Sequence, residues 1–231
     1  MSINLAQLKQ LQLDYAHRII LHDDVGFKTP TLIGGTDVGF ENNGGITRAA
    51  IVVLSYPSFE LVEYQVVKIP TTMPYIPGYL SFREFPALAL AWQKITCKPE
   101  LLLVDGQGVA HPRQFGIASH LGLLLDIPTI GVAKRRLYGQ YEPVAQVPLS
   151  CQPLLDNHNN TLIGHVLRSK AKCNPLFISS GHRISQRSAL NWVILCLNGY
   201  RLPEPTRFAD AVASNKPLFQ KLLAKSANAT A

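Results

Sequence analysis

The sequence is poor in acidic residues, in paired cysteines and in long apolar runs. Its 231 residues include 15 Asp and Glu against 22 Lys and Arg, which gives a formal net charge of +7. The four cysteines (Cys97, Cys151, Cys173 and Cys196) are scattered without a C-x-x-C pair, so neither a zinc site nor a disulfide framework is indicated. No apolar run reaches the ~18 residues that a membrane-spanning helix needs. We therefore expect no membrane insertion.

The N-terminal residues also lack the features of a secretory leader. Residues 1–20 place Leu5, Leu8, Tyr15 and Ile19 at helical spacing with charged residues between them, which is typical of an amphipathic helix. With no sign of secretion or of disulfides, we expect a cytoplasmic protein. The positive charge suggests an anionic partner such as nucleic acid, although many basic proteins simply carry solvated lysines.

The remaining composition is that of a globular enzyme. A hydrophobic content of 47% with 16 Gly and 16 Pro argues against a disordered or fibrous chain. We find no internal repeat or linker, and we expect a single domain over residues 1–231.

The order of apolar patterns predicts an α/β fold. Three β-rich runs, at 32–40, 49–56 and 61–69, are separated by turn signals and indicate an antiparallel meander. The rest of the chain predicts short buried strands at 101–104 and 129–133 and helices at 82–92, 112–125, 185–197 and 206–225. We therefore expect a mixed five-stranded sheet, three antiparallel strands followed by α-β-α-β, flanked by helices on both faces.

Two carboxylates stand where solvent exposure is not expected. Asp37 lies inside an otherwise uncharged strand, where Asp is disfavoured because its side chain competes for local backbone hydrogen bonds. Asp105 follows the buried strand at 101–104, and α/β sheets tend to build their sites at such carboxyl ends. Both residues also have ordinary explanations, since a turn can satisfy Asp37 and Asp-Gly is a common turn dipeptide.

Glu84 and Asp210 are open to structural interpretations as well. Ser81 and Glu84 match a capping box, in which Glu84 would accept a hydrogen bond from the Ser81 backbone N–H. However, Pro86 would remove a bond from the second turn of a helix that begins at Phe82, so the helix can instead begin near Pro86. Asp210 falls in the first turns of a helix, where a carboxylate is favourable against the helix dipole.

These four acids gain significance from their joint topology. The first strand, the following helix, the next buried strand and a late helix each supply one carboxylate to a basic protein. Clustered carboxylates repel one another unless a hard cation neutralises them, and Mg²⁺ takes oxygen ligands from few side chains. A Mg²⁺ site on a surface that binds nucleic acid points to phosphodiester hydrolysis.

Basic residues are expected near the same sheet edge. Lys134 follows the strand at 129–133 and either contacts the scissile phosphate or belongs to a solvated loop. His111 is either a structural cap or an aid to proton transfer. The segment 179–183, which includes His182, precedes a helix whose N-terminus can receive a phosphate.

Residues 74–78 form the most unusual segment. Pro74 and Pro77 stiffen a Tyr-Ile pair, and Gly78 then closes the turn. Tyr75 either packs into the core or belongs to a rigid apolar wedge that enters a duplex between bases.

Together these segments resemble the endonuclease V family, the deoxyinosine 3′-endonucleases, which have a ribonuclease-H-like fold. The resemblance runs from about residue 33 to residue 214, with motifs at 75–78, 82–84, 104–113, 131–134, 181–183 and 202–207. It implies a DNA repair enzyme that cuts the second phosphodiester bond 3′ to deaminated adenine and leaves 3′-hydroxyl and 5′-phosphate ends. It also implies Mg²⁺ as cofactor, with Mn²⁺ able to substitute, and we expect a monomer.

The resemblance also implies roles for individual residues. Asp37, Glu84, Asp105 and Asp210 would hold the metal and act in catalysis together with Lys134 and His111. A strand-separating wedge would consist of Pro74, Tyr75, Ile76 and Pro77, with further DNA contacts from Arg83 and His182. The pocket for the everted hypoxanthine would include Gly78, Leu80, Gly106, Ile117 and Gly131.

Two other functions stay open at this point. A ribonuclease-H-like nuclease that acts mainly on inosine-containing RNA would share the carboxylates, but it would give residues 74–78 no special reason to be present. A non-catalytic module that binds nucleic acid would explain the charge but not the four converging acids.

Overall fold

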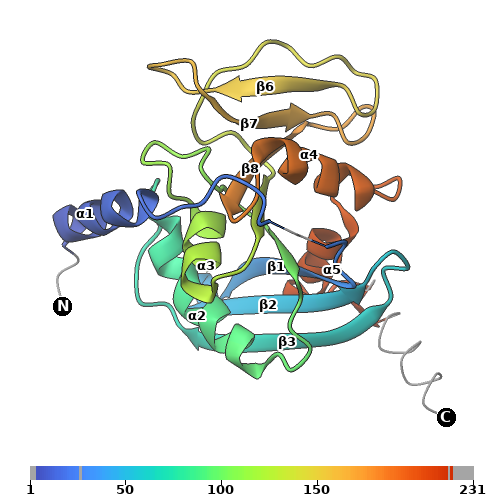
Figure 1. Ribbon diagram of the computed structural model, residues 1–231. Helices are drawn as coiled ribbons and strands as arrows, with labels where there is room; N and C mark the ends of the chain where they lie inside the picture. The colour runs from blue at the N-terminus through green and yellow to red at the C-terminus, as the bar shows by residue number, and fades with distance from the viewer. Residues whose placement is uncertain (1–3, 26–27, 218, 221–231) are drawn as a thin grey trace.

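Figure 1 shows the computed structural model of the protein, which describes residues 4–25, 28–217 and 219–220. Within that part of the chain, five α-helices surround one sheet with the strand order β3-β2-β1-β4-β5-β8-β7-β6. The helices are α1 (Leu5–Ala16), α2 (Leu80–Lys94), α3 (Ile117–Leu125), α4 (Gln186–Leu195) and α5 (Glu204–Ala213). The strands are β1 (Leu32–Glu41), β2 (Ile46–Ser55), β3 (Leu61–Pro70), β4 (Leu101–Val104), β5 (Thr129–Ala133), β6 (Cys151–Leu155), β7 (Leu162–Leu167) and β8 (Leu176–His182).

The first three strands form the antiparallel meander that the sequence predicts. β1 pairs with β2 along its whole length, from Leu32 opposite Ser55 to Glu41 opposite Ile46. β4 then runs parallel to β1, and β5 runs parallel to β4. Because parallel strands end at the same edge of a sheet, residues that follow β4 and β5 are brought close to the middle of the longer β1.

Helices cover both faces of the sheet, as predicted (Figure 1). Side chains alternate along β2, so Ala49, Ile51 and Val53 pack toward α2 and α3. The side chains between them pack toward α5 on the other face. α4 lies over β5 and β8 on that same face through Ala189 and Val193. Burial on both faces explains why the central strands are almost continuously apolar.

The sheet is wider than predicted. β8 pairs with β5, β7 with β8 and β6 with β7, all antiparallel, so the sheet has eight strands rather than five. The prediction is right for β1 to β5 and wrong beyond them. No strand was predicted at β8, whose polar residues Ser179, Ser180 and His182 are all buried.

Two helices begin elsewhere than predicted. α2 starts at Leu80, so Ser81 lies inside the helix, and its hydroxyl has no hydrogen-bond partner among the described residues. The capping-box interpretation of Glu84 is therefore wrong, and Pro86 is accommodated within α2. α3 begins at Ile117 rather than at residue 112.

α5 covers only the first part of the helix predicted at 206–225. It ends at Ala213, with Ser214 as its C-cap, and residues 218 and 221–225 lie outside the described part of the chain. Within the described residues, none of the helices combines the length and the hydropathy that crossing a bilayer demands.

Candidate active site

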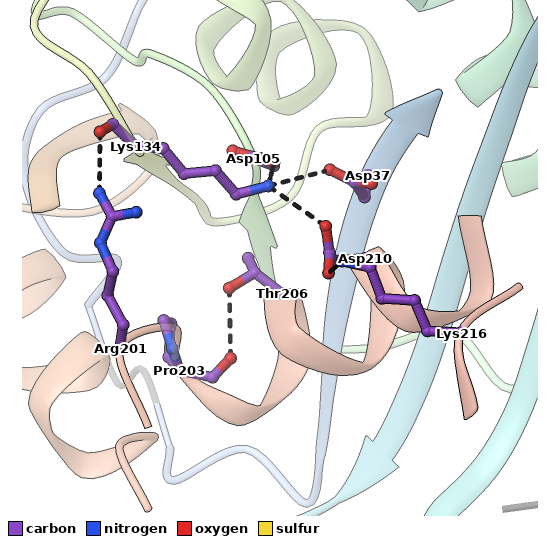
Figure 2. Close-up of polar contacts among 8 residues, drawn as sticks. All are labelled: Asp37, Asp105, Lys134, Arg201, Pro203, Thr206, Asp210 and Lys216. Atoms are coloured by element: carbon purple, nitrogen blue, oxygen red, sulfur yellow. Dashed lines mark hydrogen bonds and ion pairs between the residues drawn. The ribbon is translucent and has the colours of Figure 1, made fainter. Parts of the chain in front are cut away.

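Three charged side chains meet on the face of the sheet that α5 covers. Asp37 lies in β1, Asp105 directly follows β4, and Lys134 directly follows β5. The Lys134 Nζ lies 3.6 Å from Asp37 Oδ1 and also contacts the Asp105 carboxylate (Figure 2). The Asp105 backbone N–H donates to the Thr36 carbonyl at 3.2 Å, which fixes the end of β4 beside Asp37.

A third carboxylate reaches the same ammonium group from α5. Asp210 Oδ1 lies 3.5 Å from Lys134 Nζ (Figure 2). The helix approaches the sheet this closely because residue 35 is glycine: a Cβ there would lie 2.0 Å from the Pro205 carbonyl oxygen. Gly35 and Asp37 share a face of β1, since side chains alternate along a strand. One glycine therefore allows the helix to bring its carboxylate to the sheet.

Glu84 joins the cluster from α2, on the opposite face. Burial, reinforced by the charge of Asp105, raises the pKa of Glu84 to about 8. Burial, followed by the hydrogen bond and the charge of Asp105, raises the pKa of Asp37 to about 9. Burial by itself would lower the pKa of Lys134, but the charges of Asp105 and Asp37 outweigh it and raise that pKa. Four carboxyl groups thus share the ammonium groups of Lys134 and of Lys216, which contacts Asp210, and the raised pKa values keep Asp37 and Glu84 protonated near neutral pH.

A cavity of about 370 Å³ adjoins the carboxylates, and its size is within the ~300–1,000 Å³ range of small-molecule sites. Asp37, Glu84, Asp105 and Lys134 all contribute to its lining. The rest of the lining comes mainly from Tyr75, Gly78, Leu80, Ser81, Gly106, Gln107, His111, Phe115, Gly116, Ile117 and residues 135–137. A bound group would therefore be in reach of the acidic cluster.

Tyr75 stands exposed beside this cavity. The residue is 61% exposed, so the interpretation that Tyr75 packs into the core is wrong. It lines the cavity and also a second hollow of about 410 Å³, to which Arg83 contributes. Gly78 ends the segment with φ of +79°, in the left-handed region that favours glycine. The 74–78 segment thus presents an aromatic ring between two hollows.

The chain was compared with known protein families. A model of the family described as Endonuclease V matches residues 14–211, which is most of the sequence. This chain belongs to the Endonuclease V family. It is therefore a nuclease, a hydrolase that acts on nucleic acid.

Solved Endonuclease V structures share its fold. Endonuclease V from Streptomyces avermitilis is 35% identical, with a TM-score of 0.84 and a match that covers 93% of each chain. The catalytic domain of human Endonuclease V is 34% identical, with a TM-score of 0.84 over 95% of this chain and 97% of that one. Endonuclease V of Ciona intestinalis is 27% identical, with a TM-score of 0.80 over 91% of this chain and 96% of that one. Its structure contains a 24mer DNA with an inosine followed by a ribo-adenosine.

Membership of the Endonuclease V family implies a metal-dependent nuclease. Among the described residues, no three His, Cys, Asp or Glu side chains are arranged as a ready-made metal site. The donors nevertheless fit a hard cation, because Asp37, Asp105 and Asp210 already gather around one ammonium group. Carboxylate oxygens are the ligands that Mg²⁺ prefers, and the raised pKa values of Asp37 and Glu84 reflect the same need for positive charge.

His182 lies away from the cluster of carboxylates around Lys134. β8 runs antiparallel to β5, so His182 is opposite Thr129 at the amino end of β5, whereas Lys134 follows the carboxyl end. The ring of His182 is buried, and its Nδ1 accepts a hydrogen bond from the Ile20 backbone N–H at 3.3 Å. This position separates His182 from the carboxylate cluster, and a contact of His182 with DNA stays a prediction.

The N-terminus of α4 is likewise not open to a phosphate. The Asp23 carboxylate accepts hydrogen bonds there from the Ser185 backbone N–H at 3.0 Å and from the Ser188 hydroxyl at 2.7 Å. Arg183 forms an ion pair with Asp24 at 2.9 Å. These groups hold the segment that follows α1, so the chain itself takes the position that we predicted for a phosphate.

Of the five residues predicted for the base pocket, Gly78, Leu80, Gly106 and Ile117 line the cavity. Gly131 does not line it. It packs behind it, where a Cβ would lie 2.3 Å from the Gly108 backbone nitrogen.

Sequence reasoning missed Gln107, which also lines the cavity. Its side-chain amide donates to the Arg135 carbonyl at 2.9 Å and ties the loop after β4 to the segment after β5. A glutamine between two glycines is uncharged and belongs to no periodic pattern, so its place in the 104–113 motif is the only sequence signal of a functional role.

Proposed function

We propose that this protein is a DNA repair endonuclease for deoxyinosine. It would hydrolyse the second phosphodiester bond 3′ to the lesion and leave 3′-hydroxyl and 5′-phosphate ends. The observation that carries the proposal is the cavity that exposed Tyr75 shares with the carboxylate cluster. Enzymes that act on a base inside a duplex must turn it out of the stack, so an opening element, a base pocket and a hydrolytic site need to be neighbours. The inosine-containing DNA bound by the Ciona protein supports this assignment.

The wedge and the pocket would divide the work of recognition. Pro74 and Pro77 stiffen the segment, and the Tyr75 ring would stack where the displaced base had been. The everted base would lie among Leu80, Ile117 and the loop after β4. Hypoxanthine carries a carbonyl oxygen where adenine carries an amine. A backbone N–H aimed at that position would therefore donate a hydrogen bond to hypoxanthine. With adenine the same N–H would face the amine, a second donor, and the base would be rejected.

The charged cluster would perform the hydrolysis. Asp37, Glu84, Asp105 and Asp210 would hold Mg²⁺, for which Mn²⁺ could substitute, and the metal supplies an activated water and stabilises charge on the attacking and leaving oxygens. Lys134 would contact the scissile phosphate, since the neighbouring carboxylates keep its ammonium group charged.

Around this cluster, Arg83 and the basic residues at 135–136, which line the two hollows, would contact the DNA backbone.

A cleavage assay tests the proposal directly. A duplex with one deoxyinosine should be nicked in the presence of Mg²⁺, and the same duplex with adenine should stay intact. Asp105→Ala should abolish cutting while lesion binding persists, whereas Tyr75→Ala should lose lesion recognition first. Glu142→Gln changes an exposed carboxylate and serves as the control. No nick in wild type, or equal nicking of both duplexes, would refute the proposal.

Inosine-containing RNA is the second candidate substrate. The ribo-adenosine that follows the inosine in the Ciona complex favours a comparison of both sugars. Matched DNA, RNA and chimeric strands, each with one inosine, separate the two possibilities by their kcat/KM values. Faster cutting of the all-RNA strand would replace the DNA repair role with an RNA-processing one. A non-catalytic module no longer fits, because the family is one of nucleases.

A further inference from the structure

Gln12 is the one buried residue of α1, a helix whose other residues are exposed or half-buried. Its side chain is 0% exposed. Burying a primary amide is unfavourable unless its oxygen and its two N–H groups find partners, and an apolar residue would pack there at lower cost. The residue also precedes residues 14–211, so the family match assigns it no role. A buried glutamine at this position therefore calls for a specific explanation.

All the polar atoms of the Gln12 side chain are engaged. Its Oε1 accepts from Arg113 Nε at 2.5 Å. Its Nε2 donates to the Gly78 carbonyl at 3.0 Å and to the Phe115 carbonyl at 3.3 Å. One side chain of α1 thus links the end of the wedge segment to the loop that precedes α3.

The Gly78 carbonyl is the centre of this network. Besides Gln12, it accepts hydrogen bonds from His111 Nε2 at 3.0 Å and from Arg113 Nη2 at 2.6 Å. The carbonyl only accepts, so Nε2 carries the proton of the His111 ring, and Nδ1 accepts from the Arg113 backbone N–H at 3.1 Å. Both ring nitrogens of His111 are therefore engaged, Nε2 with the Gly78 carbonyl and Nδ1 with the Arg113 backbone, which leaves neither for proton transfer.

Gly78 itself joins the wedge to the catalytic helix. It directly follows Pro77, and α2 with Glu84 begins at Leu80. Glycine adopts positive and negative φ about equally readily, so its own preference does not fix the left-handed conformation at Gly78. We infer that the hydrogen bonds to its carbonyl select this conformation. Arg113 adds a second contact, since its guanidinium lies 4.4 Å from the Tyr79 ring centroid.

We propose that Gln12 is a positioning residue that holds the wedge at residues 74–77 in the conformation that enters a duplex. The role rests on the proposed function, because it presumes that the wedge separates strands around the lesion. It assigns α1 a part in lesion recognition although α1 contributes no residue to the cavity lining. Single-stranded inosine substrates need no strand separation, so they should depend far less on Gln12 than duplex substrates do.

The test compares Gln12→Leu with wild type on the same inosine sequence in duplex and single-stranded form. Loss of the three hydrogen bonds of the Gln12 side chain should lower kcat/KM on the duplex by about tenfold, mainly through KM, and on the single strand by less than about twofold. Gln12→Glu keeps the acceptor for Arg113 but cannot donate to Gly78, and it should show the same selective loss. This second variant keeps the test valid if Gln12→Leu does not fold. Gln10→Leu, an exposed position on the same helix, is the matched control.

A second measurement reports the wedge directly. A 2-aminopurine placed beside the deoxyinosine brightens when it is unstacked, and it can be followed on Asp105→Ala protein, which should bind without cutting. Adding Gln12→Leu to that protein should reduce the brightening at saturating protein. Equal loss on both substrates, or unchanged brightening, would overturn the positioning role. Wild-type protein that cuts neither inosine substrate would instead refute the proposed function.

Discussion

Replacing Asp37 by Asn separates what the active site needs from what the fold tolerates. Burial, together with the neighbouring Asp105, raises the pKa of Asp37 from 3.8 to about 9. In the unfolded chain the same carboxyl ionises near its ordinary pKa. Between these two pKa values the folded protein therefore binds one more proton than the unfolded chain, and its stability falls by about 1.4 kcal/mol for each pH unit gained.

The magnitude follows from the width of that window. From pH 3.8 to pH 7.5 the free energy of unfolding would fall by an amount on the order of 5 kcal/mol. Relaxation and water entry around the group reduce such penalties, so we expect a loss of about 2 kcal/mol in metal-free protein. Asn has no proton to bind and can still donate to Asp105. The Asp37→Asn protein should therefore melt roughly 4–8 °C higher than wild type at pH 7.5. The difference should shrink toward zero as pH falls to about 4, because below the unfolded pKa of 3.8 the wild-type carboxyl is protonated in both states.

The assay is thermal unfolding in EDTA across pH 4 to 9, with Glu142→Gln as an exposed control. Addition of Mg²⁺ should raise the melting temperature of wild type more than that of the variant, because the variant lacks one of the four carboxylates that we propose hold the metal. Cleavage by the variant should be abolished. If Asp37→Asn melts at or below wild type at pH 7.5 in EDTA, or if the difference does not change with pH, the electrostatic reasoning is wrong.

Further predictions concern packing, capping and charge. Gly35→Ala should push α5 from the sheet, lower the melting temperature and reduce the cleavage rate at least tenfold. Gly39→Ala is the control: its Cβ would lie 3.7 Å from the nearest atom, so it should leave the cleavage rate near that of wild type. Asp23→Ala should destabilise the protein by about 1 kcal/mol without affecting cleavage. Hydrogen bonds from Ser185 and Ser188 outweigh burial and lower the pKa of Asp23, so the stability that Asp23 contributes should be lost as pH falls below about 4. Arg136→Gln should weaken DNA binding at low salt and reduce the slope of log affinity against log salt by about one; an unchanged slope would remove this residue from the DNA contacts.

The part of the fold that could be predicted is the part with local signals. The short apolar run at 101–104 followed by Asp-Gly marks a buried strand and its end without reference to any partner. β8 has no such mark, because its burial depends on partners far along the chain. The Ser179 hydroxyl, for example, accepts a hydrogen bond from the Gly108 backbone N–H at 2.9 Å.

The same reasoning applies to the candidate site. Strand ends bring Asp105 and Lys134 together by topology alone, and this could be predicted. His182 could not be placed, because its location depends on β8 running antiparallel to β5, and the sequence does not reveal that direction. Gln12 acts on Gly78 across 66 positions, and no pattern within α1 distinguishes it from its neighbours.

Glycines at and near the cavity limit how this enzyme could change during evolution. A Cβ at Gly108 would lie 2.1 Å from the Ser180 carbonyl oxygen, and one at Gly116 would lie 2.2 Å from the Gln107 carbonyl oxygen. Backbone thus packs on backbone at both glycines, so a side chain at either position would displace the chain. If the cavity holds the base as we propose, selection for another base would have to act at Leu80 and Ile117, which line the cavity with side chains. Libraries for altered lesion preference should therefore vary those two positions and leave the glycines unchanged.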